Sequence, residues 1–204
     1  MHLKRNKALR SWPIKRKGTK FLVVPSHNQK NSIPLLIILR EMMDLVKTRR
    51  EAKKIIFEKK VKVNGKIVGD EKLALSLLDI LTVGEKNYRI ILKNKKFALE
   101  ETKEKDKIAK IIGKKVLGKD EIQINLSDGR NFLSKEAMNV GDSVVIFESK
   151  FKKIIKMKEG AKALITKGKH LGEEGTIEKI DGKKVEIKLS EGKINLDIGN
   201  VMVV

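Results

Sequence analysis

Apolar residues crowd one stretch near the start of the chain and alternate with polar residues over much of the remainder. In residues 33–46, ten apolar side chains surround most of a helix circumference, which predicts a largely buried helix. A second helix is expected to begin at Thr48, because Thr48 and Glu51 have the spacing of a capping box. Apolar residues then follow at i, i+3 and i+4 from Ala52.

Short alternating segments come next and predict strands. Residues 60–68 alternate around Asn64-Gly65, the strongest short signal for a β-hairpin. Two further strands are expected over residues 79–83 and 88–92, whereas residues 97–114 are charged and weakly helical.

The second half of the chain has the pattern of an all-β protein. Residues 121–126 alternate and lead into a turn at 127–131, and strands are expected over 143–147 and 151–157. Residues 158–204 alternate again and contain seven glycines, which predicts short strands, Gly turns and a small barrel.

Charge changes the interpretation of the N-terminal segment. The chain has 47 Lys and Arg against 26 Asp and Glu, a formal net charge of +21. Residues 1–40 hold ten of these basic residues, and the first acid is Glu41. With so little apolar surface, residues 1–32 are expected to be disordered until they meet a polyanion. Trp12, the only tryptophan, either stacks on a base or anchors this segment to the core; both interpretations remain open.

The same composition narrows the choice of partner. No apolar run approaches the roughly 20 residues of a membrane-spanning helix, and no signal peptide is evident, so we expect a cytoplasmic protein that binds nucleic acid and not membrane. Scattered lysines can also reflect ion-pair networks, but those require matching acids. Cysteine is absent and the histidines His2, His27 and His170 are dispersed, so we expect no disulfide, metal site or cofactor.

Two motifs give the charge a context. Residues 48–56 followed by Val61-Lys62-Val63-Asn64-Gly65 resemble the S4-type RNA-binding domain, two helices and a β-hairpin. Residues 159–177 resemble a KOW motif, found in ribosomal proteins and transcription elongation factors. In the KOW motif, Gly168, Gly172 and Gly175 are expected to adopt positive φ and to bring the backbone close to a partner.

Further short motifs extend the resemblance to the whole chain. They are His2-Leu3-Lys4-Arg5, Ala8, Ser11-Trp12, Pro25-Ser26-His27, Pro34-Leu35 and Asp128-Gly129-Arg130-Asn131. Their order is similar to that of the ribosomal S4e family of archaea and eukaryotes. The resemblance implies a structural protein of the small ribosomal subunit, bound to ribosomal RNA and to neighbouring ribosomal proteins, with no small-molecule substrate.

The fold expected is therefore α+β and multidomain. It comprises a basic N-terminal arm (1–33), an S4-type domain of helical hairpin and β-hairpin (34–96), a β-rich central domain (97–157) and an SH3-like KOW barrel (158–204). Two alternatives use the same motifs: a KOW-type transcription elongation or antitermination factor, and the targeting part of an RNA-modifying enzyme. No catalytic constellation is evident, so we expect no enzymatic activity.

The expected RNA contacts are basic residues near helix starts, turns and the N-terminus, with one aromatic residue among them. They are Lys4, Arg5, Lys7, Arg10, Trp12, Lys15, Arg16, Lys17, Lys20, Arg49, Arg50, Lys53, Lys54, Lys60, Lys62, Arg130, Lys167, Lys169 and His170.

Overall fold

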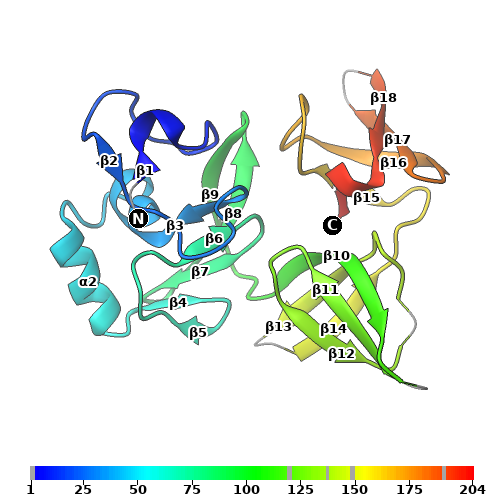
Figure 1. The fold of residues 1–204 in the computed structure, drawn as a ribbon, viewed down its shortest axis with the longest axis horizontal. Coiled ribbons are helices and arrows are strands. Elements are labelled where there is room, and N and C mark those ends of the chain that lie inside the picture. The colour runs from blue at the N-terminus through cyan, green and yellow to red at the C-terminus, as the bar shows by residue number, and fades with distance from the viewer. Residues whose placement is uncertain (1–2, 119–120, 137, 148–149, 190–191) are drawn as a thin grey trace. The chain divides into compact units, whose positions relative to one another are not determined.

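The computed structural model describes residues 3–118, 121–136, 138–147, 150–189 and 192–204 (Figure 1). His2 lies outside these residues. The chain divides into two compact units, Met1–Lys107 and Ile108–Val204, which are described separately below. Within the described ranges, no helix has both the length and the apolar character needed to cross a membrane. Strands outnumber helices in both units, and the α+β class rests on the few helices of the first.

The first unit is built around a five-stranded antiparallel sheet with the order β5-β4-β7-β8-β9. Its strands are β4 (Val61–Val63), β5 (Lys66–Ile67), β7 (Ile80–Val83), β8 (Lys86–Lys93) and β9 (Lys96–Thr102). Asn64 and Gly65 join β4 to β5 with φ of 50° and 81°, as a two-residue type I′ turn requires. The predicted hairpin and the strands near 79–83 and 88–92 are confirmed.

The predicted helix over residues 33–46 is too long at both ends. Ile33 lies in β3 (Ser32–Pro34), which pairs with β6 (Ala74–Ser76). The helix comprises only α1 (Leu35–Ile37) and the π-type turn η2 (Ile38–Met42). Pro34 keeps the preceding residue extended, and Asp44 adopts a left-handed φ of 51° just after the helix.

The second predicted helix is confirmed as α2 (Arg49–Phe57). The Thr48 hydroxyl accepts a hydrogen bond from the Glu51 backbone N–H at 3.3 Å, so Thr48 is the N-cap. The helix buries Ala52 and Ile56 against the unit and leaves its other faces exposed.

The N-terminal segment is ordered, so the prediction of a disordered arm is wrong. Its strands β1 (Leu3–Lys4) and β2 (Phe21–Leu22) pair, with η1 (Arg5–Lys7) after β1. Trp12 is only 2% exposed, and its indole Nε1 donates to the Ser32 carbonyl at 2.8 Å. Backbone hydrogen bonds and one large aromatic side chain thus replace the apolar surface that the sequence lacks.

The weak helix predicted over residues 97–114 is also wrong, because these residues form β9 and most of β10 (Lys107–Val116). β8 and β9 make a long hairpin around Asn94 and Lys95, both at positive φ, with Leu92 opposite the buried Phe97. Lys and Glu occupy the exposed positions of these strands and obscure the alternation.

The second unit contains two five-stranded antiparallel sheets. The first has the order β12-β11-β10-β13-β14, with β11 (Ile122–Leu126), β12 (Asn131–Ser134), β13 (Ser143–Phe147) and β14 (Lys150–Ile155). Its core includes Ile111, Ile124, Leu126 and Val144. The strands predicted over 121–126, 143–147 and 151–157 are confirmed.

The other sheet of this unit has the order β18-β17-β16-β15-β19. Its elements are β15 (Lys162–Ile165), β16 (Glu174–Asp181), β17 (Lys184–Leu189), β18 (Gly192–Asp197), the 3-10 turn η3 (Ile198–Asn200) and β19 (Val201–Val203). Ala163, Ile177, Ile187 and Val203 lie in its core. The alternating strands are confirmed, and closure into an SH3-like barrel stays a prediction.

Candidate nucleic-acid interface

The largest concentration of uncompensated charge lies in the N-terminal segment. Eight Lys or Arg and no acid occur between Leu3 and Leu22. Most of these side chains are exposed, namely Lys4, Lys7, Arg10, Lys15, Arg16, Lys17 and Lys20. In the chain they belong to β1 or to the segment that joins β1 to its antiparallel partner β2, and Figure 1 shows the backbone of this segment.

Arg5 is an exception within this segment, because its side chain points into the protein's own loop. Its Nε donates to the Thr19 carbonyl at 2.7 Å, Nη1 to the Lys15 carbonyl at 2.6 Å and Nη2 to the Thr19 hydroxyl at 3.0 Å. The sequence predicts Arg5 as an RNA contact, whereas the structure engages three of its nitrogens within residues 15–19.

Trp12 requires a similar correction. A side chain that is 2% exposed has no free face on which a base could stack. Of the two interpretations left open by the sequence, the structure supports the anchor, in which the indole fixes the basic segment to β3 through Ser32.

The start of α2 carries four of the predicted contacts, but they are not equivalent. Arg50, Lys53 and Lys54 are exposed and lie on neighbouring positions of one helix face. The Arg49 guanidinium instead donates through Nε to Glu71 Oε1 at 2.8 Å and through Nη2 to the same oxygen. Its charge is therefore cancelled by a carboxylate, which the sequence did not indicate.

Glu71 has an unusual environment for a carboxylate. Its side chain is 6% exposed, and its backbone carbonyl accepts the N–H of Leu36 at the start of α1. Burial raises the pKa of Glu71, but the hydrogen bond and charge of Arg49 outweigh burial, so the pKa lies below its ordinary value. Arg49 thus keeps a buried carboxylate ionised and ties α2 to the loop after β5.

The β4–β5 hairpin presents Lys60 and Lys62 to solvent, as predicted. Lys62 lies opposite Ile67 on the exposed face of the hairpin. Lys60 Nζ forms an ion pair with Glu58 at 2.6 Å. This pair is exposed, so an RNA phosphate can compete with Glu58 for the lysine.

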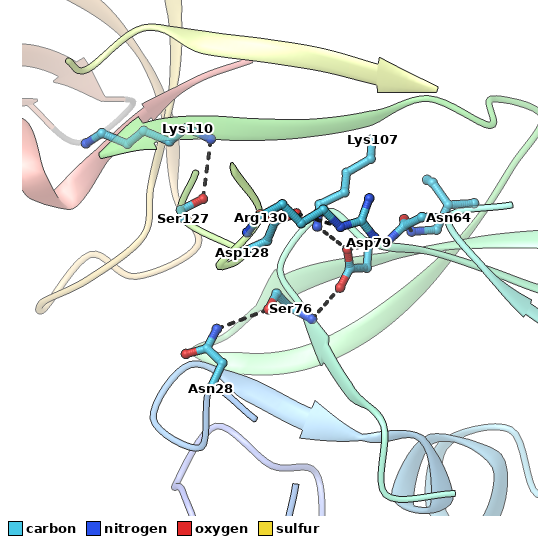
Figure 2. Close-up of polar contacts among 10 residues, drawn as sticks. Asn28, Asn64, Ser76, Asp79, Lys107, Lys110, Ser127, Asp128 and Arg130 are labelled. Atoms are coloured by element: carbon cyan, nitrogen blue, oxygen red, sulfur yellow. Dashed lines mark hydrogen bonds and ion pairs between the residues drawn. The ribbon is translucent and has the colours of Figure 1, made fainter. Parts of the chain in front are cut away.

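A buried polar network supports this hairpin from beneath (Figure 2). Asn64 Nδ2 donates to Asp79 Oδ1 at 2.8 Å, and Asn64 Oδ1 accepts the Ile80 N–H at 2.9 Å. The other Asp79 oxygen accepts the Ser76 N–H at 2.6 Å, and Lys107 Nζ lies 2.5 Å from Asp79 Oδ1. The Asn-Gly signal identified the turn, but no sequence signal connects it to residues 79 and 107.

The predicted contacts of the second unit lie in two turns. Arg130 is half-buried between β11 and β12, with its Nε 3.5 Å from Asp128 Oδ2 (Figure 2). Lys167 and Lys169 are exposed in the turn between β15 and β16, and His170 Nδ1 lies 2.9 Å from Glu173 Oε2.

The glycines of this turn have two different roles. Gly168 and Gly172 have positive φ of 97° and 89°, as expected. Gly175 does not; it lies in β16, where a Cβ would come within 2.6 Å of the Lys188 carbonyl. The close approach predicted for a partner is therefore made by the neighbouring strand β17.

Among the residues that the structure describes, no group of three or more His, Cys, Asp or Glu side chains lies together as a metal ion would require. The exposed candidate residues are Lys and Arg side chains on ordered backbone, and such side chains suit the binding of a polyanion.

Three family models match consecutive parts of the chain. An S4 domain matches residues 34–79, ribosomal family S4e matches 84–154, and a KOW motif matches 159–188. Small ribosomal subunit protein eS4 of Archaeoglobus fulgidus is 37% identical over 186 residues, covering 87% of this chain and 79% of that protein. The eS4 protein of Methanocaldococcus jannaschii is 36% identical over 202 residues, covering 90% and 83%.

A solved structure agrees with these matches. The crystal structure of 30S ribosomal protein S4e from Thermoplasma acidophilum superimposes with a TM-score of 0.74 at 30% identity. The match covers 86% of this chain and 95% of that one.

Proposed function

The chain belongs to the ribosomal family S4e and is a structural protein of the small ribosomal subunit, and we propose that it binds ribosomal RNA there through the exposed basic side chains described above. The observation that carries this proposal is the ordered segment from Leu3 to Leu22, which holds eight basic residues and no acid. A folded segment with that charge repels itself unless a polyanion neutralises it, and RNA phosphates do so.

The residues proposed to contact RNA are the exposed members of the predicted set. They are Lys4, Lys7, Arg10, Lys15, Arg16, Lys17, Lys20, Arg50, Lys53, Lys54, Lys60, Lys62, Lys167 and Lys169, joined by the half-buried Arg130 and His170. Arg49 is also exposed but is left out, because its guanidinium is paired with Glu71. Most such contacts go to phosphate and ribose and fix the position of the protein, while RNA shape selects the site.

The proposed setting is the cytoplasmic ribosome, with neighbouring ribosomal proteins as further partners. The transcription-factor and enzyme-targeting alternatives gain no support from the relatives described above, which are named as ribosomal proteins.

Salt dependence tests the proposal directly. With on the order of 6–10 phosphate contacts, affinity for purified small-subunit RNA should fall roughly 10³–10⁵-fold between 50 and 200 mM salt. Sedimentation with small subunits after a high-salt wash gives the matching test in the assembled particle. A flat salt titration would contradict phosphate neutralisation as the basis of binding.

A further inference from the structure

We propose that Arg5 is a positioning residue that folds residues 15–20 into a preformed loop, and that this loop, not Arg5, presents the basic side chains to RNA phosphates. The proposal rests on the proposed function, because it explains how one part of the RNA surface is built. It assigns Arg5 a role different from that of its basic neighbours.

The first support is the number of contacts that one side chain makes. Three Arg5 nitrogens donate to Thr19 and Lys15 across the loop, and the Arg5 backbone N–H donates to the Lys20 carbonyl at 3.0 Å. Thr19 also donates its hydroxyl to the Phe21 carbonyl at 3.2 Å. A planar guanidinium with directed donors holds both sides of the loop at once, which an ammonium group does not.

The second support is the space reserved for this guanidinium. Gly18 has φ of 146°, and a Cβ on it would lie 2.8 Å from Arg5 Nη2 and 3.0 Å from Cζ. Any side chain at position 18 would therefore strain the backbone and displace the Arg5 fork. The loop sequence is suited to enclose an arginine.

The third support is the chemistry of the acceptors. The acceptors of Arg5 are two carbonyls and a hydroxyl, which are neutral, so its hydrogen bonds do not cancel its charge. The loop thereby becomes ordered while it remains fully cationic. Lys15, Arg16, Lys17 and Lys20 stay exposed around it.

Preorganisation gives this arrangement its benefit. A disordered basic segment must lose conformational entropy when it binds RNA, whereas a loop already fixed by Arg5 loses less. In this arrangement the exposed basic side chains of the loop contact phosphate, whereas Arg5 holds the loop in place. Replacing Arg5 should therefore weaken binding even when the positive charge is kept.

The experiment compares Arg5→Lys and Gly18→Ala with the parent protein, using purified small-subunit RNA. Both variants keep the net charge. Each should lose roughly tenfold or more in affinity, because the loop residues must be ordered again on binding. Both should also be cut faster by trypsin at Lys15, Arg16 and Lys17. Gly84→Ala is the matched control, since Gly84 has positive φ but open space around a Cβ.

Two results would overturn the proposal. The first is binding of RNA by Arg5→Lys as tight as that of the parent, which would show that only the charge at position 5 matters. The second is a loss of affinity in both variants while their loops resist trypsin as in the parent, which would make Arg5 a direct RNA contact. Trp12 fluorescence verifies that the segment remains docked in each variant. Failure of the proposed function is distinguishable, because it would appear in the parent as absent salt-dependent binding.

Discussion

Arg5 near the N-terminus and Arg49 at the start of α2 both donate hydrogen bonds within the protein, but with opposite consequences for charge. Arg5 donates to neutral oxygens of Lys15 and Thr19, so its segment keeps its full positive charge. Arg49 donates to the buried Glu71 carboxylate, so the pair is close to neutral. Whether a basic residue attracts a polyanion therefore depends on whether its hydrogen-bond acceptor is neutral or negatively charged. Amino-acid composition does not reveal that acceptor.

Strand β10 repeats this contrast with two buried lysines. Lys107 forms an ion pair with Asp79, whereas Lys110 Nζ donates to the carbonyls of Val201, at 2.6 Å, and Ile198. Burial, with a smaller contribution from the charge of Lys167, lowers the pKa of Lys110 to about 8. Carbonyl dipoles compensate a buried ammonium less well than a carboxylate does.

The largest loss of stability is expected for the buried ion pair between Asp79 and Lys107. Asp79→Asn should reduce the free energy of unfolding by about 3–5 kcal/mol, because it removes the carboxylate that pairs with the buried Lys107 ammonium. Urea denaturation measures it. Asp181→Asn is the control, since that carboxylate forms an exposed pair with Lys179 and should cost less than about 1 kcal/mol. If both variants lose the same small amount of unfolding free energy, the charge of Asp79 does not hold Lys107 in place.

A somewhat smaller effect on stability is expected for Lys110, whose ammonium donates to two carbonyls, and this effect depends on pH. The folded pKa of Lys110 lies near 8, below the value of about 10.4 in an unfolded chain. Between these values the unfolded chain binds more protons, so stability should rise with pH. Relative to Lys110→Met, the parent should gain on the order of 2–3 kcal/mol from pH 8 to 10. Parallel stability curves for the two proteins would contradict this.

The next largest loss of stability is expected for the ion pair between Arg49 and Glu71. Arg49→Ala should cost about 2 kcal/mol of stability, because the buried Glu71 carboxylate loses a charged donor. Adding Glu71→Gln should recover part of that loss. Arg50→Ala is the matched variant: stability should stay within about 0.5 kcal/mol while affinity for ribosomal RNA falls. The comparison fails if the Arg49 and Arg50 variants have the same melting temperature and the same affinity.

The smallest effect concerns the cap that precedes both arginines. Thr48→Ala should cost about 1 kcal/mol of stability by removing the acceptor for the Glu51 N–H. Thermal unfolding followed by circular dichroism detects such a change. Lys53→Ala, at an exposed position of the same helix, should leave the melting temperature unchanged. An equal shift in both variants would mean that helix propensity, not the cap, accounts for the loss.

Local signals in the sequence proved sufficient for part of the fold. The Asn64-Gly65 turn and the Thr48 cap depend on neighbouring residues, and both are confirmed. The family was also identifiable, because its motifs extend over the whole chain. By contrast, β9 and β10 were predicted as weak helix, since their stability comes from pairing with strands that composition does not indicate.

The candidate site shows the same limit. Exposure of Lys15, Lys17 and Arg50 agrees with the sequence interpretation, but their RNA contacts stay a prediction. The partners of Arg5 and Arg49 lie 10 to 22 residues away along the chain, so their roles required three-dimensional information.

The burial of Trp12 also gives the protein an optical property. As the only indole in the chain, held away from water against β3, it should emit at short wavelength only while the N-terminal segment is docked. Its fluorescence therefore follows the first unit, whereas far-ultraviolet circular dichroism follows the strands of both. A difference between the two unfolding midpoints would measure how independently the units melt.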